Sequence, residues 1–216
     1  MDFSEVAPKM EDFFSDGEVL TRTAGQMFAN FETQPDVLLI TSGYIKLVTY
    51  TTNRQERIQY IAGPGEGIPM HNLFAGITPQ PYQLYASAFT DVTYLSKDRQ
   101  KFLAFIEVEP SVVIAILQGI MQATFDRLYN FNLETSEQRV AHILVLYARK
   151  HGTKEDANFT KLDLPMNTHI VANTVYLSKA VTADILEGFR SQGYVEFQGE
   201  NILVAILRLK AMAGIR

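Results

Sequence analysis

The feature that most constrains this chain is a long apolar segment, residues 110–133, whose only charged residues are Asp126 and Arg127. No proline follows Pro110, and proline suits the first turn of a helix because the N–H that it lacks would have no partner there. Apolar residues recur at spacings of three and four, which predicts a helix. They form two stripes, one with Val113, Leu117, Ile120, Thr124, Leu128 and Phe131 and the other with Ile114, Met121, Phe125 and Tyr129.

A helix of this length, about 36 Å at 1.5 Å per residue, needs an apolar neighbour for each of its two stripes. One interpretation is the central core helix of a single domain. The other, which we favour because the segment joins two halves of different composition, places the helix between its own domain and the same helix of a second copy. The interface of that homodimer centres on five side chains: Val113, Leu117, Ile120, Thr124 and Leu128.

The half that precedes this helix has the pattern of a β-structure. Over residues 17–95, glycines separate short runs of β-branched and aromatic residues, and the clearest strands are 37–40, 44–50 and 58–61. Residues 53–56, between two of these strands, predict a hairpin turn. Short strands at close spacing indicate a sandwich or a barrel.

The half that follows the helix is helical first and β-structured last. The first predicted helix has Val140, Ile143, Leu144 and Tyr147 on one face and ends near Gly152, and a polar stretch follows at 153–158. A short helix at 167–174 is capped by Asn167 or Thr168, and the next helix runs from the cap Ser178 to about Gln192, where Gly193 stops it. Strands at 194–197 and 202–204 follow, joined by a turn at 198–201. Two helices around a short turn, followed by a two-stranded wing, are the outline of a winged helix-turn-helix.

The sequence resembles the Crp/Fnr superfamily of transcription regulators over nearly its whole length. Five segments carry the resemblance, in the order in which the family has them. In the first half, residues 39–47 resemble its strand–turn–strand "ILSGxVKL", residues 63–67 resemble its "GPGELxG", and residues 102–110 resemble the approach to its dimer helix. In the second half, residues 138–144 resemble its "xRIAxxLL", and Ser178 and Gly193 match the ends of its recognition helix. Each motif is common by itself, and the specificity comes from their order.

The resemblance implies an α+β chain with three parts. We expect a cyclic-nucleotide-binding-like β-barrel, a double-stranded β-helix or jelly roll, as the sensor domain at residues 1–109. A dimerisation helix follows at 110–136, and a winged helix-turn-helix DNA-binding domain at 137–216.

The sensor departs from the cyclic-nucleotide-binding pattern. The family's ribose-binding Glu corresponds to Glu66, but its phosphate-binding Arg-Ser pair corresponds to Gln80 and Pro81. Gln80 carries no charge and Pro81 has neither a hydroxyl nor an N–H, so the anion subsite lacks the donors that a phosphate needs. We expect little response to cyclic AMP. Glu66 is either a ligand residue or a turn carboxylate, and the residues of an effector pocket would be Glu66, Gln80, Tyr82, Leu84 and Thr124.

The recognition helix departs as well. Where the family often has "SRETVxR", this chain has Ser178, then Lys179 and Ala180, with Val181 beside them and Asp184 at the second Arg. Lys179 suits a guanine or a phosphate, Val181 a thymine methyl, and Asp184 a cytosine amino group. The alternative is that Lys179 and Asp184 form a solvated pair with no role in reading DNA.

Nearby positions complete the predicted DNA contacts. Thr168 and His169 are predicted phosphate contacts at a helix N-terminus. Lys161 is a further candidate for a contact with the DNA backbone or a base. Tyr176 replaces the usual turn glycine, so we expect an irregular turn.

Composition excludes several function classes. There is no cysteine, which rules out disulfides, thiol catalysis and a cysteine-bound iron–sulfur cluster. His71, His142, His151 and His169 form no H-x-H or H-x-x-x-H metal pair, and no G-x-S-x-G motif or phosphate-binding loop is present, so we predict no enzyme, no metal and no cofactor. The acidic start and the lack of about 18 consecutive apolar residues predict a cytoplasmic protein outside the membrane.

The net charge of −5 divides unevenly, with −7 on residues 1–136 and +2 on residues 137–216. The leading hypothesis is a homodimeric transcription regulator that binds a pseudo-palindromic double-stranded DNA site, with RNA polymerase as a possible further partner and an unidentified effector. The alternative is a sensor or interaction protein of the same fold that has lost DNA binding.

Overall fold

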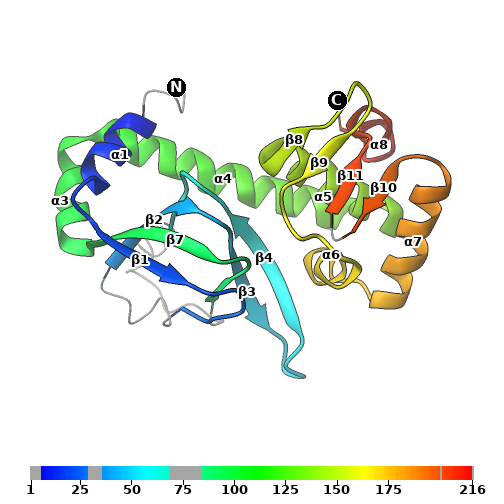
Figure 1. Ribbon diagram of the computed structural model, residues 1–216, viewed down its shortest axis with the longest axis horizontal. Helices are drawn as coiled ribbons and strands as arrows, with labels where there is room; N and C mark the ends of the chain where they lie inside the picture. Colours follow the sequence, from blue (N-terminus) through cyan, green and yellow to red (C-terminus); the bar gives the residue numbers. More distant parts are fainter. Residues whose placement is uncertain (1–5, 29–35, 69–83, 200, 216) are drawn as a thin grey trace. The chain divides into compact units, whose positions relative to one another are not determined.

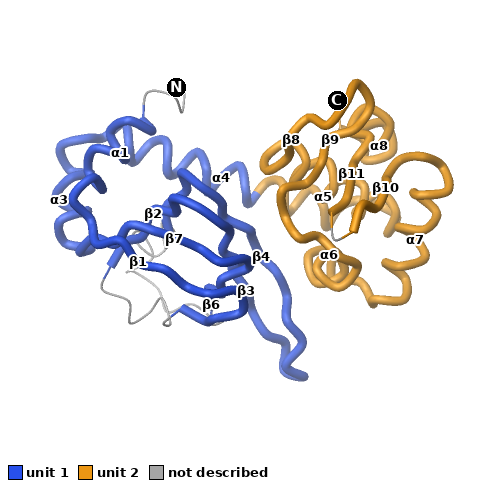
Figure 2. The backbone as a smooth tube through the Cα atoms, viewed as in Figure 1, with its two compact units in different colours: residues 1–124 blue, residues 125–216 orange. Residues whose placement is uncertain are grey.

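The structure is a computed structural model that describes residues 6–28, 36–68, 84–199 and 201–215 (Figure 1). The chain divides into two compact units, residues 1–124 and 125–216, and Figure 2 colours them separately. The boundary between the two units falls within the long helix α4.

The first unit is built mainly from antiparallel strands. Its elements, in chain order, are α1 (Ala7–Phe14), β1 (Glu18–Arg22), β2 (Asp36–Ser42), β3 (Ile45–Tyr50), β4 (Glu56–Ala62), β5 (Gly67–Ile68), β6 (Tyr85–Ala88), β7 (Val92–Asp98), α3 (Arg99–Val108) and the first part of α4 (Pro110–Asn132). The strands form two sheets with the orders β1-β7-β2-β5 and β4-β3-β6. The predicted strands and the hairpin between β3 and β4 are confirmed.

Two apolar clusters hold this unit together. The first lies within the barrel and includes Leu38, Ile45 and Tyr94, and the second joins α1, α3 and the start of α4 around Phe14 and Phe102. Alternating side chains of β2 supply both clusters, since Leu38 and Ile40 point to the first and Val37 and Leu39 to the second, as the period of a strand requires.

The turn between β2 and β3 needs glycine. Gly43 has φ +75°, and a Cβ on it would lie 2.0 Å from the carbonyl oxygen of Asp91. No L-residue with a side chain fits there without moving the backbone, which gives the glycine of the "ILSGxVKL" resemblance a steric cause.

The second unit contains the rest of the chain. Its elements are the end of α4, α5 (Ser136–His151), β8 (Gly152–Lys154), β9 (Thr160–Leu162), α6 (Thr168–Val175), α7 (Lys179–Ser191), β10 (Val195–Gln198), β11 (Asn201–Val204) and α8 (Ile206–Met212). The four strands form one antiparallel sheet in the order β10-β11-β9-β8. The expected α+β class is confirmed, with a jelly-roll barrel followed by a helical unit.

Some elements of the second unit were not expected from the sequence. The stretch at 153–158 is not wholly irregular, because Gly152–Lys154 pairs with Thr160–Leu162 as a hairpin. The helix α8 was not anticipated either, although Leu209 anchors it in the core. The helix α5 is fixed at its start by a reciprocal capping box between Thr135 and Gln138.

Among the described residues, no single helix is long and apolar enough to cross a bilayer; α3 and α4 meet that test only as a pair bent by 109°.

Candidate DNA-binding interface

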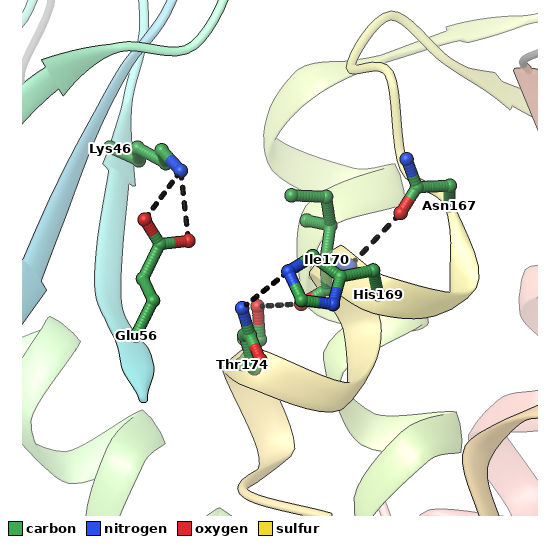
Figure 3. A network of polar contacts seen from close by, with 7 residues as sticks. Lys46, Glu56, Asn167, His169, Ile170 and Thr174 are labelled. Carbon is green, nitrogen blue, oxygen red and sulfur yellow. Dashed lines mark hydrogen bonds and ion pairs between the residues drawn. The ribbon is translucent and has the colours of Figure 1, made fainter. Parts of the chain in front are cut away.

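The helix α6 forms the first half of the predicted helix-turn-helix. Its cap is Asn167, whose side-chain oxygen accepts a hydrogen bond from the backbone N–H of Ile170 at 3.0 Å (Figure 3). Thr174 donates from its hydroxyl to the carbonyl of Ile170 at 2.8 Å. Residues 170–175 are all buried, so α6 supports its neighbours and leaves little surface for a ligand.

The exposed end of α6 carries the two predicted phosphate contacts. Thr168 is half-buried, and His169 is exposed with its ring Nε2 at 3.1 Å from the side-chain nitrogen of Asn173 (Figure 3). Both residues lie in the first turn of the helix, where backbone N–H groups favour an anion. Their role in DNA binding stays a prediction.

The helix α7 separates into a buried face and an exposed face. Ser178 caps it by accepting a hydrogen bond from the N–H of Val181 at 3.2 Å, and Thr182 is fully buried. The other buried residues are Ile185, Leu186 and Phe189. The residues predicted to read DNA all lie on the exposed face: Ser178, Lys179, Ala180, Val181 and Asp184.

A two-stranded wing follows α7. Gly193 has φ +67° and reverses the chain after the helix, as predicted. The strand β10 is buried only at Val195, while Glu196, Phe197 and Gln198 are exposed. Its partner β11 is buried at Ile202–Val204 and anchors the wing in the core.

The charges on this surface are mixed. Arg190 pairs with Glu187 on α7 at 2.7 Å, and both side chains are more than half exposed, so the pair adds little stability. The negative charge of Glu187 also cancels the positive charge of Arg190 on this surface. Lys179 is exposed at the start of α7, and Lys161 is half-buried in β9. Asp184 and Glu196 add negative charge to the same elements. The surface therefore has fewer net cations than nucleic-acid binding usually uses.

The turn between α6 and α7 contains a feature that the sequence did not reveal. Tyr176 has φ +59° and ψ +39°, the left-handed conformation that glycine usually supplies. The expectation of an irregular turn is therefore wrong, because Tyr176 takes the backbone conformation of the glycine that it replaces. Arg127 and Arg139, from α4 and α5, donate to the backbone carbonyls just before this turn. The sequence did contain one sign of this contact, because Arg127 is the only cation of the apolar segment 110–133.

The predicted effector residues are only partly described. Gln80, Pro81 and Tyr82 lie outside the described residues, and so does His71. Glu66 accepts hydrogen bonds on both carboxylate oxygens, from the hydroxyl of Tyr60 and from the N–H of Gly63 at 2.8 Å. This is the geometry of a turn carboxylate.

The other two candidates do not converge with it in the described contacts. Leu84 is half-buried and packs on the barrel cluster, and Thr124 is exposed with its hydroxyl donating to the carbonyl of Ile120 at 2.8 Å. An effector pocket made from these residues stays a prediction.

The helix α4 exposes an apolar stripe that differs slightly from the predicted dimer stripe. Val113 is half-buried against the second cluster of the first unit, and Ile120 is half-buried as well. The large side chains of α4 that stay between 41% and 59% exposed are Ile114, Leu117, Met121, Phe125, Leu128 and Phe131. The exposed set thus combines members of both stripes at spacings of three and four.

A polar pair is buried where α4 meets α5. Asn130 is fully buried, and its side-chain nitrogen donates to the carbonyl of Arg139 at 2.9 Å and lies 3.2 Å from Nδ1 of His142. Burial lowers the pKa of His142, and Asp126 opposes this effect. Because Nδ1 faces an amide N–H, the neutral ring fits this site with its proton on Nε2.

Within the described ranges, no group of three His, Asp or Glu side chains is placed to hold a metal ion. The fold is a jelly-roll barrel, a long helix with an exposed apolar stripe, and a winged helix-turn-helix whose second helix has one exposed face. That combination is the fold of the Crp/Fnr regulators, and the resemblance is confirmed at this level.

A curated relative and several solved structures support the same fold, although no family model matches the chain. A curated relative, the nitrogen fixation regulation protein FixK of Azorhizobium caulinodans, is 20% identical over 173 residues, which cover 79% of this chain and 67% of FixK.

Solved structures of the same fold cover nearly the whole chain. A variant of CooA from Carboxydothermus hydrogenoformans has a TM-score of 0.74 at 18% identity, over 94% of this chain and 90% of that one. FixK2 from Bradyrhizobium japonicum has a TM-score of 0.73 at 18% identity, over 91% and 96%. A CRP/FNR-family transcriptional regulator from Thermus thermophilus has 0.70 at 16%, over 92% and 100%.

Proposed function

We propose that this chain is a homodimeric, sequence-specific DNA-binding transcription regulator of the Crp/Fnr type, and not an enzyme. The observation that carries the proposal is the exposed face of α7, where Lys179, Val181 and Asp184 have no role in the core of their own unit. The relatives and structural neighbours whose names state a function are regulators, which supports the same assignment. Such a protein acts where the chromosome lies, in the cytoplasm.

The second copy in this proposal covers α4. Ile114, Leu117, Met121, Phe125 and Leu128 form one continuous stripe, and contiguous exposed apolar side chains mark an interaction site. Their spacings of three and four are close to those of a coiled-coil seam, which is complementary to itself across a two-fold axis. A second copy of the helix is therefore the occupant that the pattern fits best.

The two-fold dimer defines the DNA partner. With one α7 per subunit, it binds a pseudo-palindrome whose half-sites lie about one helical turn apart. In each half-site Lys179 contacts a guanine or a phosphate, Val181 a thymine methyl and Asp184 a cytosine amino group, with Thr168 and His169 on the backbone. RNA polymerase is a further candidate partner of a regulator bound in this way.

Cyclic nucleotides are not the effector in this proposal. Gln80 and Pro81 replace the Arg-Ser pair of the family, and both carboxylate oxygens of Glu66 already have partners within the chain. Losing one charge-assisted phosphate contact costs roughly 1.5–3 kcal/mol, which weakens binding about ten- to a hundredfold. Calorimetry should show no micromolar binding of cyclic AMP or cyclic GMP, and such binding would contradict this part of the proposal.

A second candidate function is a sensor or interaction protein that has lost DNA binding. Asp184, the Glu187–Arg190 pair and Glu196 favour it, because they leave few free cations on this surface. Selection from a pool of random duplexes separates the two candidates. Enrichment of a defined sequence, with affinity that falls as salt rises, supports the regulator. No salt-sensitive binding at all supports the alternative.

A further inference from the structure

We propose that Arg127 and Arg139 are positioning residues that hold the turn before α7 in its left-handed conformation and so set the direction in which α7 is presented. This inference rests on the proposed function for its link to DNA. The backbone of this turn is unfavourable, because a left-handed conformation costs an L-residue with a side chain about five- to thirtyfold in population. Something in the surroundings must offset this cost at Tyr176.

The two guanidinium groups offset it through the backbone first. Nη1 of Arg127 donates to the carbonyl of Thr174 at 2.6 Å, and Nη2 of Arg139 donates to the carbonyl of Val175. These are carbonyls of the last turn of α6, which have no N–H partner within a helix that ends at Val175. Cations at that end also complement the helix dipole.

Arg127 acts on the Tyr176 side chain as well. Its guanidinium carbon lies 4.4 Å from the centre of the Tyr176 ring and 4.8 Å from the centre of the Phe131 ring. The two rings are 5.4 Å apart. Within this contact range a guanidinium is attracted to an aromatic face. One side chain therefore binds both the backbone before the turn and the ring that projects from it.

The turn in turn fixes α7. The N–H groups of Tyr176 and Leu177 both donate to the carbonyl of Ala172, and Ser178, two residues on, caps α7. Only Leu177 separates the left-handed residue from the cap. A change at Tyr176 therefore changes the direction of the whole helix, while the phosphate contacts of Thr168 and His169 stay in place on α6.

The test uses full-length variants and a duplex enriched by selection. Arg127→Met keeps the aliphatic stem and removes the charge, and Arg127→Lys keeps the charge without the planar group. Arg149→Met is the matched control, because Arg149 is exposed at the end of α5. We expect Arg127→Met to weaken specific binding roughly tenfold to a hundredfold, from the loss of a charge-assisted contact. Binding to random duplex should change less than about twofold, since it depends on phosphate contacts.

A second substitution distinguishes positioning from general destabilisation. Glycine adopts the left-handed conformation freely, so Tyr176→Gly in the Arg127→Met background should recover most of the specific affinity. Arg127→Lys should fall between wild type and Arg127→Met. Equal losses on both duplexes, wild-type binding by Arg127→Met, or no recovery by glycine would each overturn the proposal.

Hydrogen exchange tests the same turn without DNA. Amides of residues 172–178 should exchange faster in Arg127→Met than in wild type, while those of residues 140–148 keep their rates. If wild type binds no DNA but this difference appears, the proposed function fails and the role of Arg127 in the turn stands. If exchange of residues 172–178 is unchanged, the role of Arg127 in the turn is wrong.

Discussion

Helices α4 and α5 follow each other in the chain, and both carry apolar side chains at helical spacing, but these side chains are buried in α5 and largely exposed in α4. In α5, Val140, Leu144 and Val145 are fully buried within their own unit. In α4, Leu117, Met121 and Phe125 are large side chains that remain exposed in the single chain. The difference shows that periodicity identifies a helix but not its neighbour: α5 finds its partners in its own unit, and we propose that α4 finds them in a second copy.

The largest expected effect comes from a charge in the α4 stripe. Met121→Glu would place two carboxylates in the proposed dimer interface, and burying each costs several kcal/mol. We expect the dimer dissociation constant to rise more than about a thousandfold, as measured by analytical ultracentrifugation. Gln100→Glu adds the same charge on an exposed site of α3 and should leave the dimer intact. A stable Met121→Glu dimer would show that another surface joins the copies.

The next prediction concerns the buried face of α5. Leu144→Ala removes a fully buried side chain and should lower the free energy of unfolding by about 2–5 kcal/mol. Urea unfolding at several protein concentrations compares it with Leu128→Ala in α4. The loss in Leu128→Ala should shrink when the protein is dilute enough to be monomeric, whereas the loss in Leu144→Ala should persist. The same concentration dependence in both variants would erase the proposed difference between the helices.

A smaller effect concerns the exposed face of α7. Lys179→Ala should weaken DNA binding, and if Lys179 contacts only phosphate, the slope of log affinity against log salt should fall by about one on every duplex. Asp184→Ala is the matched variant on the same face. It should change the preferred base and should not lower the slope of log affinity against log salt. Titrations at two salt concentrations on enriched and random duplexes measure both. Wild-type behaviour of both variants would mean that α7 does not enter the groove.

The smallest effect is a pH dependence that belongs to α5. Burial lowers the pKa of His142 in the folded protein below its value of about 6.5 in an unfolded chain. The unfolded state therefore takes up the proton first, and stability falls as the pH drops below about 6.5.

Replacing the ring should remove this part of the pH dependence. His142→Gln should narrow the difference in unfolding free energy between pH 7.5 and 5.5, and the exposed His169→Gln serves as its control. An unchanged difference in His142→Gln would contradict the buried, neutral state of this histidine.

The sequence predicted the elements better than their contacts. The α4 helix and the α6–turn–α7 order followed from spacing. The cap Ser178 was predicted correctly, and Asn167 is the one of the two predicted alternatives, Asn167 and Thr168, that caps α6. The exposed side of α4 was not predictable to the residue, since Val113 and Ile114 are both apolar and only the packing of the first unit decides between them.

The turn at Tyr176 was beyond the sequence for a similar reason. A tyrosine has no local preference for a left-handed backbone, and the groups that hold it there come from two other helices. Whether Glu66 is a ligand residue or a turn carboxylate also depended on contacts, because the sequence of the loop is the same in both cases. Its hydrogen bonds to Tyr60 and Gly63 favour the turn.

The most direct test of a two-fold regulator joined through α4 is the stoichiometry of its DNA complex. Sedimentation of wild type with the enriched duplex should give a complex of two chains per duplex, and a duplex with one half-site destroyed should bind far more weakly. One chain per duplex at full occupancy, or a stable dimer that leaves every duplex free, would contradict the account.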